Sequence, residues 1–343
     1  MNVAQVIALT QEWVEVHGSQ TPGFCGAHLM GGILAMPKDS FFPLHNDVDF
    51  NIVLRGNQEF ETHDIFYNGL ILEYSTVGSE YYRSPEAVLS NPQIASNLAV
   101  DSILSDPVGL LQPLHAVVKR QYLNPTWVKA RCTYEKNLVM QSLEELHHAA
   151  SPFEAILPLS FAIVYLAGLL TIADLRPPTH RRALILMRDV LHQQMRAELL
   201  EEALCLLGYA HLTHQQVEVF LQDVAITFDR AVEVKRTASP FEFKLQSHVR
   251  PYLVDGLQEL IQEGNHREIM LWITLVLLLS NTTIQQDAPE SEKPFFQAKL
   301  DRLFQEIGFD APNCIESRLQ GAKELADKLF TIADEMLGQR AEL

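Results

Sequence analysis

The feature that most constrains the fold is a change of periodicity at Asn124-Pro125. Before this point, short apolar runs show the period of β-strands, and after it apolar residues recur at helical spacing as far as the C-terminus. We therefore predict an α+β fold in two domains, with residues 1–124 forming a mixed-sheet domain and residues 125–343 an all-helical domain. With 343 residues and 47% hydrophobic content, the chain is long and apolar enough to bury a core in each.

The first domain is predicted to begin with a helix over Val3–Val16, followed by several strands. Asn68-Gly69 stands between two β-rich runs, a strong signal for a tight hairpin. The predicted strands cover residues 24–30, 47–54, 60–67 and 70–77. In the second domain, helical patterns cover residues 126–149, 153–174, 179–207, 213–236, 250–263, 265–281, 294–307 and 315–337.

The predicted strand over residues 47–54 has one apolar face and one polar face. Val48, Phe50, Ile52 and Leu54 point one way, whereas Asp47, Asp49 and Asn51 point the other. Two aspartates at positions i and i+2 can share a divalent cation, which also removes their mutual repulsion. The alternative is a solvent-facing strand that carries two incidental acids.

Two neighbouring features favour the metal site. A strand that ends at Gly31-Gly32 and leads into a helical turn over Ile33–Met36 offers backbone N–H groups to a phosphate. A third acid, Glu73, follows the Asn-Gly turn on a run that can lie beside the strand of Asp49. Together these residues predict a site that binds a metal ion and a phosphate.

With these residues identified, the sequence resembles the polymerase-β-like nucleotidyltransferases, and among them the aminoglycoside adenylyltransferase type. The resemblance covers about residues 1–125 and rests on a strand followed by Gly-Gly, an Asp-x-Asp strand, a third acid and an Asp-Pro-x-Gly segment. The linker of fourteen residues, 33–46, is longer than is usual in the family, and the second glycine replaces a common serine. The matching segments are His28–Gly32, Asn46–Phe50, Leu70–Tyr74 and Ser102–Gly109.

The resemblance implies a function and a site. Asp47, Asp49 and Glu73 are expected to be the catalytic and metal-binding residues, holding one or two Mg²⁺ ions, with Glu73 as a metal ligand or as the base. Gly31 and Gly32 are expected to contact the phosphates of a nucleoside triphosphate, ATP in most of the family. The acceptor is expected to be a hydroxyl of a small, cationic molecule such as an aminoglycoside. A protein acceptor, or a catalytically silent nucleotide-binding protein of the same fold, are the alternatives.

Several residues beyond Asp47, Asp49 and Glu73 are further candidates for the site. Lys129 and Arg131 are expected to contact nucleotide phosphates, with a solvated helix face as the alternative. Glu135, Glu144 and Glu145 on the same predicted helix could accept a proton from the acceptor, with the same alternative. His28 and His45 flank the site in the sequence and are most simply structural, with contact to the substrate as the alternative. His147-His148, and His211 with His214, could suggest metal binding, but the sequence shows no cysteine or carboxylate that converges on either pair.

Charge and composition limit the kinds of partner and the location to be expected for the protein. The net charge is −17, and residues 1–125 hold five basic against thirteen acidic side chains, which disfavours binding to nucleic acid. The four cysteines form no CxxC pair and residues 1–10 show no signal peptide, so a cytoplasmic protein is expected. The uncharged run Ala155–Ala173 is long enough to span a bilayer, but it is expected to be a buried core helix and not a membrane segment. We expect a monomer or a homodimer.

Overall fold

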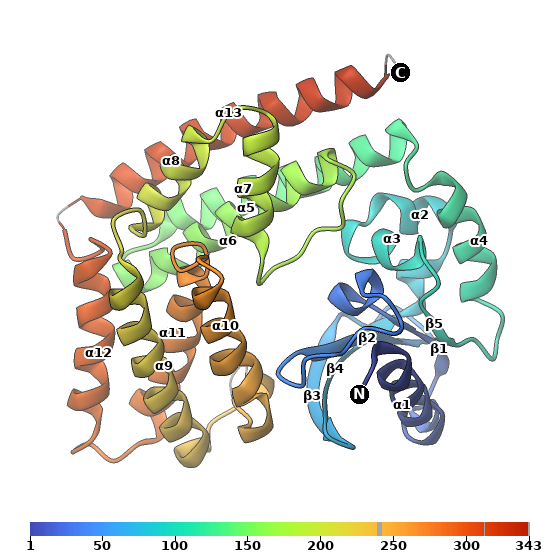
Figure 1. The fold of residues 1–343 in the computed structure, drawn as a ribbon, viewed down its shortest axis with the longest axis horizontal. Helices are drawn as coiled ribbons and strands as arrows, with labels where there is room; N and C mark the ends of the chain where they lie inside the picture. The colour runs from blue at the N-terminus through green and yellow to red at the C-terminus, as the bar shows by residue number, and fades with distance from the viewer. Residues whose placement is uncertain (239–241, 312, 342–343) are drawn as a thin grey trace. The chain divides into compact units, whose positions relative to one another are not determined.

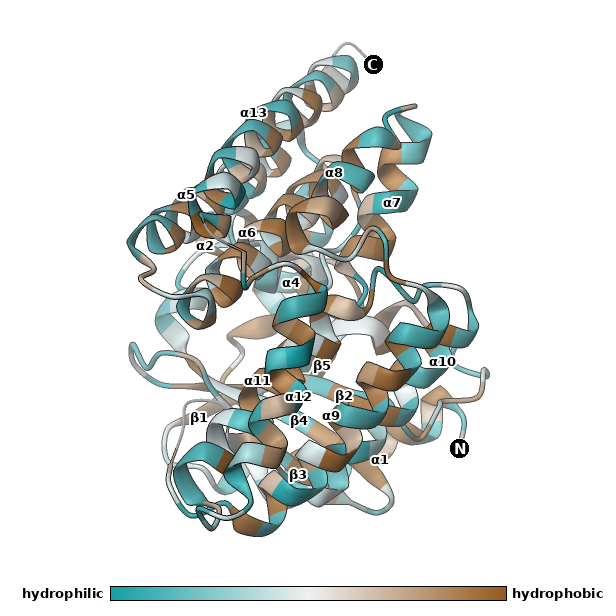
Figure 2. Ribbon diagram, turned by 90° about the vertical axis from the view of Figure 1, so that its left-hand side faces the viewer, coloured by the Kyte–Doolittle hydropathy of each residue, from teal (hydrophilic) through white to brown (hydrophobic). Residues whose placement is uncertain are grey.

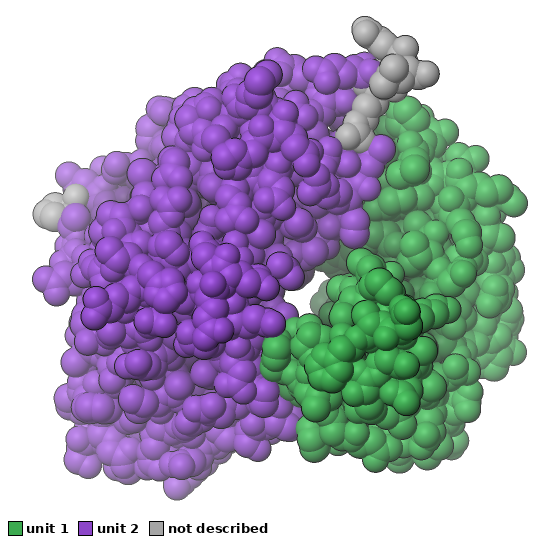
Figure 3. All heavy atoms as spheres, viewed as in Figure 1, with its two compact units in different colours: residues 1–131 green, residues 132–343 purple. Residues whose placement is uncertain are grey.

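The computed structural model describes residues 1–238, 242–311 and 313–341. The chain divides into two compact units, Met1–Arg131 and Cys132–Leu343, which Figure 3 colours separately. The first unit holds a five-stranded sheet and the second is helical, so the α+β prediction is confirmed. The predicted domain boundary coincides with the start of helix α5 (Pro125–His148), whereas the two units divide within that helix.

The sheet of the first unit has the strand order β3-β4-β2-β1-β5 (Figure 1). β2 and β4 are parallel, and the other neighbouring strands are antiparallel. Asn68 and Gly69 both have positive φ, 49° and 84°, as a two-residue type I′ turn requires, and they join β3 to β4 as predicted. The strands are β1 (Phe24–Leu29), β2 (Asp47–Leu54), β3 (Glu61–Tyr67), β4 (Leu70–Gly78) and β5 (Ile103–Ser105).

Helices cover both faces of this sheet (Figure 1). On one face the apolar side of β2 packs with helix α1 (Val3–Val16), whose Trp13 contacts Phe50. On the other face three helices missing from the sequence prediction pack on Val53 of β2: α2 (Pro85–Ser90), α3 (Pro92–Leu98) and α4 (Leu111–Gln121). The face that carries the two aspartates is therefore only partly open, and Asn51 on it is fully buried.

The Asp-Pro-x-Gly segment forms the start of α4. The carboxylate of Asp106 accepts hydrogen bonds from the backbone N–H groups of Leu110, Leu111 and Gln112, at 2.8–3.0 Å. Gly109 has a positive φ of 70°, which glycine adopts without strain. In this chain the segment therefore satisfies the first turn of a helix.

In the second unit, α6 (Pro152–Ala173) is the most apolar element. By length and composition it could cross a membrane, but 83% of its most apolar 18-residue stretch is buried within the structure. It packs against α7 (Ala183–Gln193) and α13 (Cys314–Ala341). Figure 2 shows hydrophobic and hydrophilic residues alternating along α13, whose buried positions recur at spacings of three and four.

The remaining helices follow the predicted pattern with one correction. The predicted helix over residues 179–207 is two helices, α7 and α8 (Glu198–Leu207). They are separated at Met195, whose φ is 56°, and no glycine or proline marks this break. The other elements are α9 (His214–Val234), a π-helical turn at Pro251–Asp255 that continues into α10 (Gly256–Gln262), α11 (Met270–Asp287) and α12 (Lys293–Glu306).

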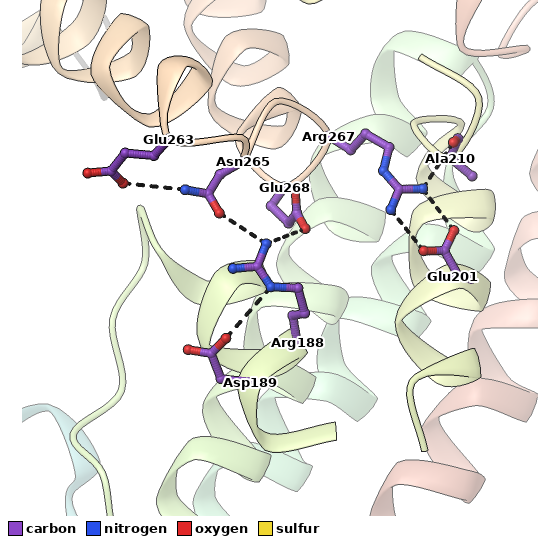
Figure 4. A network of polar contacts seen from close by, with 8 residues as sticks. All are labelled: Arg188, Asp189, Glu201, Ala210, Glu263, Asn265, Arg267 and Glu268. Atoms are coloured by element: carbon purple, nitrogen blue, oxygen red, sulfur yellow. Dashed lines mark hydrogen bonds and ion pairs between the residues drawn. The ribbon is translucent and has the colours of Figure 1, made fainter. Parts of the chain in front are cut away.

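A polar network ties α7 and α8 to the turn before α11 (Figure 4). The guanidinium of Arg188 donates to Asn265 Oδ1 at 3.0 Å and to Glu268 Oε1 at 2.8 Å. Arg267 forms a bidentate pair with Glu201, with both distances 2.9 Å. Because Glu268 is buried, its pairing with Arg188 satisfies a charge that would otherwise be costly to remove from water.

Candidate active site

The three predicted acids come together on the partly open face of the sheet. One carboxylate oxygen from each of Asp47, Asp49 and Glu73 lies within 4.8 Å of the others, and all three residues are half-buried. Asp49 and Glu73 occupy paired positions on the adjacent parallel strands β2 and β4, so their side chains project to the same side. The pairing of strands far apart in the sequence thus creates a cluster of three carboxylates.

Gly31 is held against Asp49 by the backbone. The N–H of Met30 donates to the carbonyl of Asp49 at 2.7 Å, which joins the end of β1 to β2. Gly31 has a φ of 69°, and a Cβ at this position would lie 2.5 Å from Asp49 Oδ2. A side chain here would displace the carboxylate, so the position requires glycine for two independent reasons.

Gly31 and Gly32 differ in how far neighbouring atoms already occupy their surroundings. The N–H of Gly31 donates to the side-chain oxygen of Asn97 on α3, at 3.2 Å, so this amide is already engaged. Gly32 is exposed at the start of a 3₁₀ turn (Gly31–Ala35), and a Cβ there would meet no atom within 4 Å. Of the two glycines, Gly32 is therefore the one with open space around it. Asn97, which the sequence analysis does not include, positions Gly31.

A chain of buried, hydrogen-bonded polar side chains lies on the same face of the sheet as the acids. His28 Nδ1 donates to the carbonyl of Leu29, so its Nε2 accepts from the Tyr82 hydroxyl at 2.8 Å. Tyr82 in turn accepts from the Asn51 amide at 3.2 Å. Burial lowers the pKa of His28 to about 4 and raises the pKa of Tyr82. His28 is therefore neutral at physiological pH and structural, and it places no positive charge next to the carboxylates.

The two predicted phosphate-binding cations are placed differently. Lys129 is exposed on α5. Arg131 is only 2% exposed, and it donates to the carbonyls of Leu89 and Tyr122 at 2.9 and 2.7 Å while stacking on the Tyr122 ring. The structure therefore corrects the interpretation of Arg131, because a guanidinium committed to these contacts holds helices together and is unavailable to a triphosphate.

The glutamates of α5 also differ. Glu144 and Glu145 are exposed, whereas Glu135 is 5% exposed and packs against Gly168 of α6. Burial raises the pKa of Glu135 to about 8. A carboxyl with this pKa is protonated near neutral pH, so Glu135 does not have the ionisation state of a ready general base.

A fourth carboxylate, that of Asp64, lies on the neighbouring strand β3. It lies opposite Glu73 in the antiparallel pairing of β3 with β4, and both of its carboxylate oxygens are buried. The pairing could have been read from the sequence, because a two-residue turn at Asn68-Gly69 fixes the register of the hairpin. The acids of the site therefore extend over three adjacent strands.

Comparison with known proteins adds a distant structural similarity. No protein-family model matches the chain, and no curated protein does so either. The structure is similar to that of a nucleotidyltransferase-like protein from Exiguobacterium sibiricum 255-15, with a TM-score of 0.31 and 12% identity, over 88% of this chain and 92% of that one. At this level of similarity the function has to be argued from the site's own geometry.

Proposed function

We propose that this chain is a metal-dependent nucleotidyltransferase that transfers a nucleoside monophosphate, AMP from ATP, to a hydroxyl of a small cationic acceptor of the aminoglycoside kind. The observation that carries the proposal is the convergence of Asp47, Asp49 and Glu73, with one oxygen of each within 4.8 Å of the others. The net charge of −17 favours a cationic acceptor over a polyanionic one.

The chemistry of these donors fits Mg²⁺. All three are carboxylate oxygens, the hard ligands that Mg²⁺ takes, usually one or two at a time together with the oxygens of a bound phosphate. When bound, the ion would neutralise phosphate charge and orient the triphosphate for in-line attack. Asp47 and Asp49 would hold it from one strand, and Gly31 keeps the space next to Asp49 free of a side chain.

The chain's own groups would also position the nucleotide and accept the proton. The exposed backbone at Gly32 is where the β- and γ-phosphates would approach. Glu73, paired with Asp49 across the strands, would complete the metal site or take the proton from the attacking hydroxyl. If Glu73→Gln loses a second equivalent of bound metal, Glu73 is a metal ligand. If the variant binds metal normally but loses turnover, Glu73 is the base that accepts the proton.

Binding and transfer test the proposal together. We expect calorimetry to show Mn²⁺-dependent binding of a non-hydrolysable ATP analogue that is lost in Asp47→Asn and Asp49→Asn. Glu61→Gln is the matched control, because Glu61 lies on the same sheet but on its opposite face. Unchanged binding in both aspartate variants would refute the site.

Transfer requires a second assay. Protein, Mg²⁺ and α-labelled nucleotides are incubated with a panel of aminoglycosides and other small hydroxyl compounds, and label transfer is followed by chromatography. Transfer to a protein in a treated lysate, detected by mass spectrometry, would replace the small acceptor by a protein one. Nucleotide binding with no transfer to any acceptor would support a silent binding protein of the same fold.

A further inference from the structure

A second group of potential metal ligands lies in the helical unit, at the end of α5. Glu144, His147 and His148 each offer one donor atom, and the three atoms lie within 4.8 Å of one another. His148 Nε2 is 2.9 Å from Glu144 Oε1, and the two imidazole rings are 5.1 Å apart. The sequence alone does not show a carboxylate that converges on His147-His148. In the folded helix, Glu144 is that carboxylate.

Helical geometry explains the convergence. Glu144 precedes His147 by three residues and His148 by four, and both spacings bring side chains together on a helix surface. In a tetrahedral zinc site, with metal–nitrogen distances near 2.0 Å, donor atoms are about 3.3 Å apart. All three residues are exposed, so small rotamer changes can close the present spacing without disturbing the core.

The surroundings favour a cation at this place. His147 and His148 lie in the last turn of α5, where the negative end of the helix dipole stabilises positive charge. Glu144 and His148 also border an open hollow of about 660 Å³ that Glu145 and Glu154 line as well. Among the described residues that line it there is no lysine or arginine. An ion held at this edge would keep a coordination position open to water or to a small ligand.

We propose that Glu144, His147 and His148 bind one divalent transition-metal ion of the zinc class, with at least one exchangeable position. Two nitrogens and one carboxylate oxygen match the three-ligand sets of open zinc sites. This set differs in kind from the all-oxygen cluster of Asp47, Asp49 and Glu73, because imidazole selects zinc-class ions and carboxylate alone selects Mg²⁺. The two clusters are therefore expected to select different ions.

Zinc titration of untagged, metal-stripped protein tests the site. Excess Mg²⁺ is present throughout to occupy the all-oxygen cluster, and a chromophoric chelator competes for zinc. We expect one equivalent of Zn²⁺ in the wild type, and affinity weakened by about tenfold or more in His147→Ala, His148→Ala and Glu144→Gln. With Co²⁺ as a probe, the visible absorption of a nitrogen-containing low-coordinate site should disappear in the same variants.

Matched controls separate this site from unspecific binding. The double variant His211→Ala, His214→Ala removes two exposed histidines of the same unit that belong to no three-donor cluster among the described residues, and it should keep the zinc equivalent. Asp47→Asn should also keep it, even if nucleotide transfer is lost. Equal loss in the double variant, or unchanged affinity in His147→Ala and His148→Ala, would overturn the proposal.

Discussion

The buried carboxyl of Glu135 makes the stability of the helical unit depend on pH. Glu135 is 5% exposed, and a Cβ added to Gly168 of α6 would lie 3.1 Å from its Oε2. Burial raises its pKa from 4.5 to about 8. The folded protein therefore keeps this group neutral at pH 7, whereas the unfolded chain ionises it.

The sign and size of the effect follow from proton linkage. Because the folded pKa of Glu135 is raised, its favourable contribution is complete below pH 4.5 and is lost as the pH rises towards 8. Each pH unit inside this window costs about 1.4 kcal/mol of unfolding free energy. Integrated from pH 5 to pH 7, where the unfolded carboxyl is already partly ionised at the lower end, the loss is about 2–3 kcal/mol.

The substitution Glu135→Gln keeps the size of the side chain and removes the titration. Relative to the wild type, the variant should gain about 2–3 kcal/mol of unfolding free energy between pH 5 and pH 7. Urea unfolding followed by the loss of helical circular dichroism at pH 5, 6 and 7 measures this difference.

Glu145→Gln is the matched control, because Glu145 is exposed on the same helix and its carboxyl is in water in both states. The control should show no pH-dependent gain. A difference between Glu135→Gln and the wild type that stays constant over the three pH values would refute the reasoning, since the buried carboxyl would then ionise as it does in water.

Four further outcomes are expected. In calorimetric titrations with Mn²⁺, Gly31→Ala should weaken binding about tenfold or more by displacing the Asp49 carboxylate, whereas Gly32→Ala, which meets no atom, should leave the affinity unchanged. Asp106→Ala should lower the unfolding free energy by about 1–2 kcal/mol through loss of the α4 cap, as measured by urea unfolding, and an unchanged midpoint would contradict this role. Arg131→Met should cost about 2–4 kcal/mol in the same assay because two carbonyls lose their donor, and a loss of nucleotide affinity at full stability would instead restore Arg131 to the phosphate site. Below pH 6.5 the wild type should lose stability relative to His28→Gln, because the depressed folded pKa of His28 opposes protonation until pH 4; parallel pH curves would refute its burial as a neutral ring.

Local patterns in the sequence were sufficient for the elements that carry the acids. The period-two alternation over residues 47–54 predicted β2, and Asn68-Gly69 predicted the hairpin that brings in Glu73. The same hairpin register also implies the pairing of Asp64 with Glu73. These features depend on neighbours in the chain, so they can be read without tertiary contacts.

Short helices, and breaks between helices that no glycine or proline marks, were harder to predict. α2 and α3 have only six and seven residues, too few for a helical period to stand out, although Ser84-Pro85 and Asn91-Pro92 are readable as helix starts. The break between α7 and α8 falls at the exposed residue Met195, which adopts a positive φ where α7 ends, and neither a glycine nor a proline marks the position.

The sequence by itself determined the α+β organisation and the Asp-x-Asp strand, because each rests on local periodicity. Only the tertiary structure decided what each polar side chain does. Packing of α2–α4 on the sheet buried Asn51 and His28, left Asp47 and Asp49 half open, and committed Arg131 to buried carbonyls. The burial of a polar group depends on which distant segment covers it, and that information is not contained in the neighbouring residues.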